Sequence, residues 1–125
     1  IIVIAKLCRV PRGSPNRAVA GLSMGGRQSC MLSMHYPKRF GYVGLFSGVA
    51  VPEGNEAALD AVFAAHPKLY WIGCGKADGI MVNSRKLEQY CLDHGYPVTF
   101  YESEGGHIWR NWRVYLTIFA QQLFK

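Results

Sequence analysis

The sequence predicts an α/β fold in which about four parallel strands form a sheet that helices cover on both faces. Short strand-like runs alternate with longer runs of helical spacing along the chain. The strand-like runs are almost continuously apolar, as expected for strands buried on both faces. With 125 residues and 50% hydrophobic content, the chain is long enough for one domain with a core, and we expect no second domain.

The four expected strands are short apolar runs bounded by turn-forming residues. The first opens after a Gly-Ser-Pro-Asn turn, and the third has the sequence Leu-Tyr-Trp-Ile-Gly-Cys. The strands are expected at residues 17–22, 42–47, 69–74 and 98–102.

The four expected helices follow these strands in turn. Pro37 ends the first, because a proline disfavours helical geometry at the residue before it. Gly95 is a natural stop for the third. Apolar residues four, three and four apart give the last helix one apolar face. The helices are expected at residues 24–36, 56–65, 82–94 and 109–124.

Charge and cysteine content exclude several classes of function. The net charge is +6, but the 14 Lys and Arg residues are scattered, so we expect no nucleic-acid groove. No apolar stretch reaches the roughly 20 residues needed to span a bilayer, and we expect no membrane segment. The four cysteines have no zinc-ligand spacing. We therefore expect no zinc site, and we expect Cys30, Cys74 and Cys91, which fall within apolar helix or strand patterns, to be free, buried thiols.

A Gly-x-Ser-x-Gly pattern centred on Ser23 joins the first expected strand to the first expected helix. The pattern is typical of a nucleophile elbow, a sharp turn that exposes a serine hydroxyl above the end of a sheet. Side chains at the flanking glycines would collide with the turn. A random chain of this length contains the pattern about one time in twenty, so the pattern alone is weak evidence. The strand before it and the helix after it are what favour a nucleophile at Ser23.

A serine nucleophile needs a base to accept its proton and an acid to orient that base. His107 follows the fourth expected strand, on a loop made flexible by two glycines, and Asp78 follows the third. The catalytic groups of a parallel sheet gather at the carboxyl ends of its strands. We therefore expect Ser23, Asp78 and His107 to form a triad, with the backbone N–H of Met24 as an oxyanion donor.

The remaining histidines, acids and tryptophans have simpler explanations. His35, His66 and His94 fall at helix ends or before a proline, and Asp60 and Asp93 fall on helices. Surface or capping roles are the default for all of them. Trp71 and Trp112 are expected in the core, whereas Trp109 could either pack there or border a pocket for an acyl or sugar group.

Four segments of the chain resemble the “Putative esterase” family of α/β-hydrolases. This family includes the feruloyl and acetyl xylan esterases of carbohydrate esterase family 1, and S-formylglutathione hydrolase and the mycolyltransferases are related to it. The segments are Ala-Gly-Leu-Ser-Met-Gly-Gly at 20–26, Phe-Ser-Gly at 46–48, Gly-Cys-Gly-Lys-Ala-Asp at 73–78 and Glu-Ser-Glu-Gly-Gly-His-Ile-Trp at 102–109.

The resemblance implies the C-terminal portion of an α/β-hydrolase fold, with Ser23 as nucleophile, His107 as base and Asp78 as acid. Family members are about twice as long as this chain, so we expect residues 1–125 to be one partial domain. The strands before residue 17 and the loop carrying the second oxyanion donor would then be missing. The strand at 17–22 would be an open apolar edge prone to self-association, and residues 1–16 match the family least.

The function implied is hydrolysis of carbohydrate-linked or aromatic acyl esters, of the feruloyl or acetyl xylan esterase type, without a cofactor. The substrate would be a small-molecule or polysaccharide ester, and the resemblance suggests a secreted or periplasmic location. Two alternatives stay open: acyl transfer to a sugar hydroxyl, as in mycolyltransferases, and a catalytically silent module that binds carbohydrate or protein.

Overall fold

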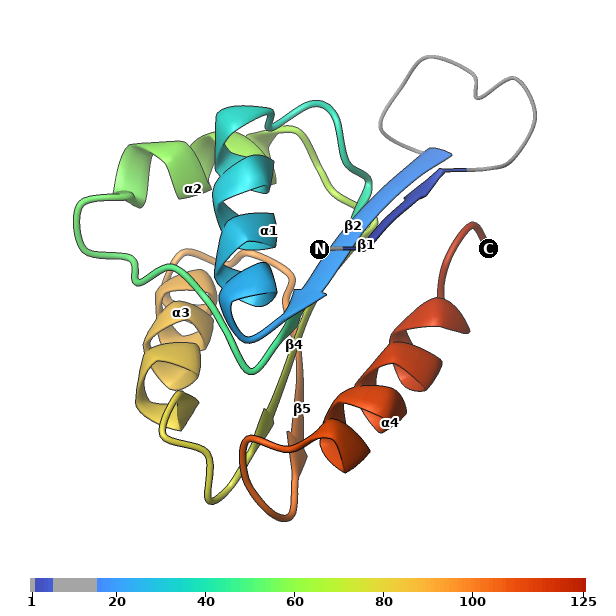
Figure 1. Cartoon of the computed structure of the whole chain (residues 1–125). Helices are drawn as coiled ribbons and strands as arrows, with labels where there is room; N and C mark the ends of the chain where they lie inside the picture. Colours follow the sequence, from blue (N-terminus) through green and yellow to red (C-terminus); the bar gives the residue numbers. More distant parts are fainter. Residues whose placement is uncertain (1, 6–15) are drawn as a thin grey trace.

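A five-stranded sheet runs through the centre of the protein (Figure 1). The computed structural model describes residues 2–5 and 16–125, with side chains from residue 16 onward. The strands lie in the order of the sequence. They are β1 (Ile2–Ala5), β2 (Arg17–Leu22), β3 (Tyr42–Phe46), β4 (Leu69–Gly75) and β5 (Thr99–Ser103).

Strands β2 to β5 are parallel, which confirms the four parallel strands that the sequence predicts. The register pairs Leu22 with Phe46, Phe46 with Gly73, and Gly75 with Ser103. The carboxyl ends of these strands therefore lie along one edge of the sheet, and the segments that follow them emerge side by side.

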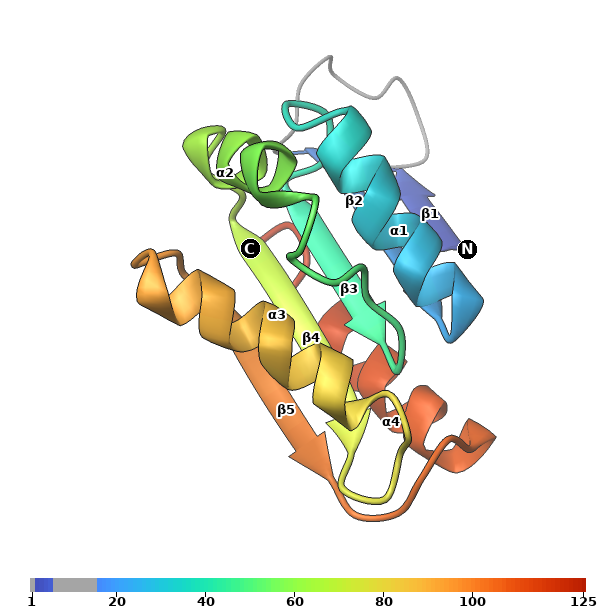
Figure 2. The same cartoon turned by 90° about the vertical axis from the view of Figure 1, so that its left-hand side faces the viewer.

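Three helices cover one face of the sheet and one covers the other (Figures 1 and 2). The crossovers between β2, β3, β4 and β5 all step in the same direction, and right-handed crossovers of this kind place their helices on one face. The chain then passes round β5 to the opposite face. The helices are α1 (Met24–His35), α2 (Glu56–Ala64), α3 (Met81–Asp93) and α4 (Trp109–Ala120).

Two hydrophobic clusters, one on each face, hold the helices to the sheet. The first lies between the sheet and helices α1, α2 and α3, and it contains the fully buried residues Leu59, Leu87 and Val43. The second contains Trp71 and Phe119, and it lies beneath α4. Trp71 and Trp112 are both buried, as the sequence predicts. None of the helices in the described ranges is long and apolar enough to cross a membrane.

The prediction of an open edge at residues 17–22 is wrong. Strand β1 pairs with β2 in antiparallel orientation, with Ile2 opposite Ala20 and Ala5 opposite Arg17. The Ile-Val-Ile-Ala sequence of β1 favours extended backbone, and its peptide groups satisfy those of β2. The free backbone edge on which we based self-association is therefore not at β2. Residues 1 and 6–15 lie outside the described part of the chain.

Close packing of α1 against the segment after β3 generates a stability prediction. A Cβ atom at Gly26 would lie 2.6 Å from the carbonyl oxygen of Gly48. We expect Gly26→Ala to lower the free energy of unfolding by about 1–3 kcal/mol, because the helix must move to relieve this overlap. Urea unfolding measures the change.

Gly79→Ala is the matched control, since a Cβ atom there meets no atom within 4 Å. A Gly26→Ala variant as stable as the wild type would contradict the account of this contact.

Candidate active site

Ser23 occupies a sharp turn between β2 and α1. Its backbone has φ 54° and ψ −121°, a conformation that side-chain-bearing residues adopt at a cost of about 1–3 kcal/mol. The N–H of Ser23 donates to the carbonyl of Phe46 at 2.8 Å, and the Ser23 carbonyl accepts from the N–H groups of Gly26 and Arg27. These bonds hold the strained residue in place, so the turn is the elbow that the sequence predicts.

Glycines on both sides let the backbone close around this turn. A Cβ atom at Gly21 would overlap the carbonyl of Gly25, and one at Gly48 would overlap the carbonyl of Ser23. The elbow therefore depends on Gly21 of the motif and on Gly48 from the segment after β3.

His107 lies on the loop between β5 and α4, with its imidazole above the carboxyl end of the sheet. Its Nε2 atom is 2.8 Å from Oγ of Ser23. Trp112, from the second turn of α4, packs edge-on against the ring, with centroids 4.9 Å apart and planes at 88°. This contact limits rotation of the imidazole.

Asp78 follows β4 and faces the other nitrogen of the imidazole. Its Oδ2 and Oδ1 atoms lie 3.0 and 3.2 Å from Nδ1 of His107. The carboxyl is buried, with 1% of the side chain exposed, and Oδ1 also accepts from the N–H of Ile80 at 2.9 Å. An ionised carboxylate only accepts hydrogen bonds, so Nδ1 is the donor and Nε2 is left to accept from the serine hydroxyl.

The pKa of Asp78 reflects opposing effects. Burial alone raises the pKa of the carboxyl, but hydrogen bonds from the Ile80 amide and from His107 outweigh burial and leave the pKa below its usual value of 3.8. The Ser47 hydroxyl lies close to the same carboxyl without a hydrogen bond of good geometry. Asp78 is therefore a charged acceptor at neutral pH.

The structure thus brings Ser23, His107 and Asp78 together in one hydrogen-bonded chain. The backbone N–H of Met24 belongs to the first residue of α1, and the first N–H groups of a helix have no acceptor within the helix. The positive end of the helix dipole also lies beside Ser23. This position suits the stabilisation of a developing oxyanion.

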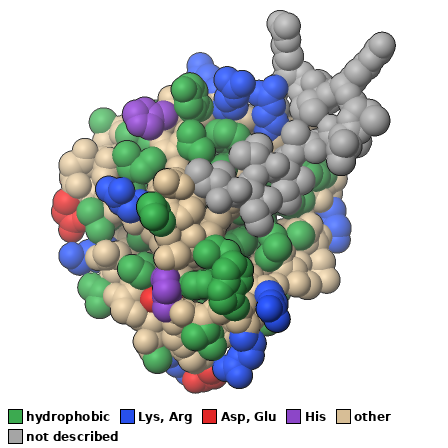
Figure 3. Space-filling model, viewed as in Figure 1, with side chains coloured by type: hydrophobic (Ala, Val, Ile, Leu, Met, Phe, Trp, Pro, Cys, Tyr) green, Lys and Arg blue, Asp and Glu red, His purple; other side chains and the backbone are tan. Residues whose placement is uncertain are grey.

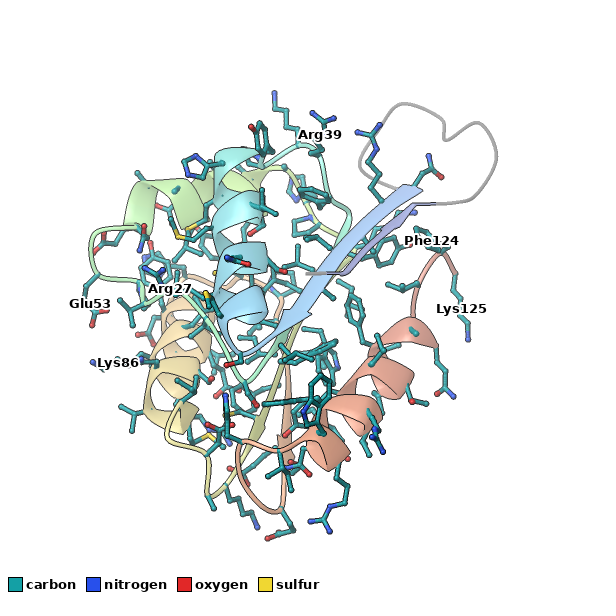
Figure 4. The ribbon with its side chains drawn as sticks, viewed as in Figure 1. Arg27, Arg39, Glu53, Lys86, Phe124 and Lys125 are labelled. Atoms are coloured by element: carbon teal, nitrogen blue, oxygen red, sulfur yellow. The ribbon has the colours of Figure 1, made fainter. Side chains whose placement is uncertain are left out.

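A cavity of about 660 Å³ opens in front of these residues. One wall is apolar and comes from the segment between β3 and α2, which contributes Val49, Ala50 and Val51. Arg27 reaches from α1 toward this segment (Figure 4), and Asn83 of α3 lines another part of the cavity. An exposed ion pair between Glu53 and Lys86, 3.8 Å apart, joins the same segment to α3 farther out (Figure 4).

Trp109 lies outside the lining of this cavity. Its side chain is 63% exposed, and it borders a separate hollow of about 130 Å³ between β2 and α4. Its ring packs edge-on against Trp112, with centroids 5.2 Å apart. Exposed hydrophobic side chains gather near a histidine on this side of the molecule (Figure 3). The role of Trp109 in binding substrate stays a prediction.

Ser47 is the site residue that sequence reasoning missed. Its hydroxyl is buried and lines the cavity, and its backbone has φ 50°. It directly follows β3, so the strand-end rule that selected Asp78 and His107 also applies to it. Cys30, Cys74 and Cys91 are buried free thiols, as predicted, whereas Cys8 lies outside the described residues. Among the described residues, no cluster of side chains could hold a metal ion.

Comparison with known proteins assigns the family. The family model described as “Putative esterase” matches residues 3–122. The chain belongs to this family. The match begins within the segment expected to resemble the family least.

Two sequence relatives of this chain are themselves esterases. An endo-1,4-beta-xylanase/feruloyl esterase of Xylanibacter ruminicola is 34% identical over 111 residues, which are 88% of this chain and 14% of that protein. An acetyl esterase of Caldicellulosiruptor saccharolyticus is 36% identical over 50 residues, 40% of this chain and 18% of that protein.

Solved structures show the same fold. A CE1 ferulic acid esterase from the anaerobic fungus Anaeromyces mucronatus matches with a TM-score of 0.77 and 24% identity, over 92% of this chain and 46% of that one. S-formylglutathione hydrolase from Staphylococcus aureus matches with a TM-score of 0.73 and 17% identity, over 92% of this chain and 54% of that one. The chain therefore has the α/β-hydrolase fold and spans about half the length of these structures.

The lowered pKa of Asp78 generates a prediction on stability. A carboxyl with a depressed pKa stabilises the fold fully above its usual value of 3.8, and this stabilisation is lost as the pH falls through the lower folded value. We expect the difference in free energy of unfolding between the wild type and Asp78→Asn to be largest at neutral pH and to shrink below pH 3.8. Urea unfolding at several pH values measures it.

Asp93→Asn, at the exposed end of α3, is the control and should change the free energy by no more than about 0.5 kcal/mol. A difference for Asp78→Asn that stays constant as the pH falls from neutral to well below 3.8 would contradict the pKa assignment.

Proposed function

We propose that this chain carries the catalytic triad of a serine carboxylic ester hydrolase. The observation that carries the proposal is the hydrogen-bonded chain from Asp78 through His107 to Ser23, with links of 3.0 and 2.8 Å. An acid, a base and a hydroxyl in this order are the groups that activate a serine for attack on a carbonyl. Membership of the esterase family supports the same reaction.

In the first half of the reaction, Oγ of Ser23 attacks the ester carbonyl carbon while Nε2 of His107 accepts the hydroxyl proton. The buried Asp78 carboxylate holds Nδ1–H and stabilises the imidazolium that forms. The tetrahedral intermediate carries its negative charge near the Met24 N–H. The C–O bond to the alcohol then breaks, and His107 returns the proton to the departing alkoxide oxygen.

In the second half, water attacks the acyl-enzyme while His107 accepts one of its protons. Collapse of the second tetrahedral intermediate releases the carboxylic acid and returns the proton to Ser23. Neither a metal nor an organic cofactor takes part in these steps. We propose that a second oxyanion donor comes from a segment upstream of the described elbow, because one donor alone leaves catalysis about 10²–10³-fold weaker.

The substrate class we propose is an aromatic or acetyl ester of a carbohydrate. Feruloyl and acetyl esterases appear among the relatives, and one similar solved structure is that of a ferulic acid esterase in complex with ferulic acid. The apolar wall of the cavity suits an acyl group, while Arg27 and Asn83 offer hydrogen bonds to polar substituents. Trp109 would stack on a sugar or aromatic ring outside this cavity.

Replacing the nucleophile tests the reaction directly. We expect Ser23→Ala in the intact protein to lower kcat for methyl ferulate or p-nitrophenyl acetate by at least about 10³-fold, because the acyl-enzyme cannot form. Release of ferulate or p-nitrophenol measures the rate.

Ser33→Ala is a matched control, since this buried serine lies on the same helix and its hydroxyl donates to the carbonyl of Cys30. Unchanged hydrolysis by Ser23→Ala would overturn the proposal. Transfer of the acyl group to an added sugar, seen by product analysis, would instead identify an acyltransferase, and a protein inactive toward every ester would be a binding module.

The proposed stacking role of Trp109 makes a separate prediction. Trp109→Ala should raise KM for a feruloylated or acetylated xylo-oligosaccharide about 5–100-fold, because stacking on an aromatic ring contributes on the order of 1–3 kcal/mol. The KM for p-nitrophenyl acetate, which carries no sugar, should stay the same. If the variant and the wild type have the same KM for the oligosaccharide, Trp109 does not contribute to substrate binding.

A further inference from the structure

Asn111 is a buried polar residue in the first turn of α4, four positions after His107, and its exposed fraction is 6%. Its side-chain amide donates one hydrogen bond to the carbonyl of Glu104 and one to the carbonyl of Gly106, each at 3.0 Å. Both amide hydrogens are therefore used on the three-residue stretch that precedes His107. Nothing in the proposed reaction requires Asn111.

The carbonyl of Gly105, which lies between those of Glu104 and Gly106, points in the other direction. Gly105 has φ +79°, which reverses the chain and turns its carbonyl toward β4 and the loop that carries Asp78. There it accepts from the N–H of Ala77 at 2.9 Å. A Cβ atom at Gly75 would overlap this carbonyl, so the two loops are in close contact. Asn111 of α4 thus holds the carbonyls of Glu104 and Gly106, and the loop that carries Asp78 holds the carbonyl of Gly105.

Two other bonds reach these carbonyls, one from the end of β5 and one from within the loop. The Ser103 hydroxyl donates to the Glu104 carbonyl at 3.1 Å, and the Ile108 N–H donates to the Gly106 carbonyl at 3.0 Å. The Ile108 bond lies within the loop. Ser103 belongs to β5, and its hydroxyl also lies 2.6 Å from the hydroxyl of Tyr115 in α4. An exposed ion pair between Lys76 and Glu104 adds little. Asn111 is the side chain of α4 that donates directly to two backbone carbonyls of the loop.

We propose that Asn111 is a positioning residue that sets the height of the His107 imidazole above Ser23. The inference rests on the proposed function, because it assigns Asn111 a role only through the base. The 2.8 Å link between Nε2 and Oγ leaves little tolerance, and a displacement of about 1 Å in such a site can cost about 10²-fold in rate. Asn111 is not among the residues that line the cavity.

Two variants of the intact protein test this role. Asn111→Leu removes both donors, and Asn111→Asp keeps the shape but, when ionised, has no hydrogen to donate. Gln122→Leu is the matched control. Gln122 lies just beyond the end of α4, and its exposed amide donates to the carbonyl of Ile118. Ser23→Ala is run in parallel. Fluorophosphonate titration counts active sites, so that loss of folded protein is separated from loss of rate per site.

With p-nitrophenyl acetate, we expect both Asn111 variants to lose about 10–100-fold in kcat per titrated site while KM changes less than about threefold. Hydrogen exchange in residues 103–108 and at Ala77 should become faster in these variants. Gln122→Leu should match the wild type in rate and in exchange.

The outcomes separate the two proposals. Unchanged exchange in residues 103–108 would overturn the role of Asn111 whatever the reaction is. Faster exchange with an unchanged kcat per site, while Ser23→Ala is inactive, would also overturn it and leave Asn111 with a purely structural role. Full activity of Ser23→Ala would instead overturn the proposed function, and the positioning role would fall with it.

Discussion

The parallel register of β2 to β5 is the constraint on which the site depends. Leu22 pairs with Phe46, Phe46 with Gly73, and Gly75 with Ser103. The segments that follow the strands therefore emerge next to one another. Ser23 and His107 are 84 positions apart in sequence, yet their side chains are within hydrogen-bonding distance. The ladder of backbone hydrogen bonds brings the two segments together, and the bonds within and between the loops then set the position of each side chain.

Two kinds of cost are concentrated at that edge and are offset by the surroundings. Ser23 has a strained backbone, which hydrogen bonds to the Phe46 carbonyl and the first turn of α1 hold in place. Asp78 is a buried charge, which the Ile80 amide and His107 stabilise. Strain and a buried carboxylate would be disadvantages elsewhere in the sheet, whereas here they fix the hydroxyl and the imidazole in one geometry.

Most of the fold followed from the sequence because its signals are local. Apolar runs, Pro37 and Gly95 predicted the elements to within a few residues, although the last helix ends at Ala120 and not at 124. The same reasoning placed Ser23, Asp78 and His107 at strand ends, and the structure brings them together. The signals of a strand end and of a glycine-flanked serine do not depend on distant parts of the chain.

The features that were missed depend on contacts between distant segments. Pairing of β1 with β2 could not be read from residues 2–5, because a four-residue apolar run does not specify its partner. The position of Trp109 outside the main cavity depends on the start of α4 and on its packing against Trp112. The two hydrogen bonds of Asn111 are also invisible in sequence, since an asparagine within a helix is most often exposed.

Covalent labelling tests the central claim, that Ser23 is a nucleophile activated by His107, most directly. The intact protein is treated with a fluorophosphonate probe, and the modified peptide is located by mass spectrometry. We expect the probe on Ser23, with a labelling rate at least about 10²-fold higher than that of His107→Ala, because the base accepts the hydroxyl proton. Modification of a different serine, or equal rates with and without the imidazole, would contradict the account.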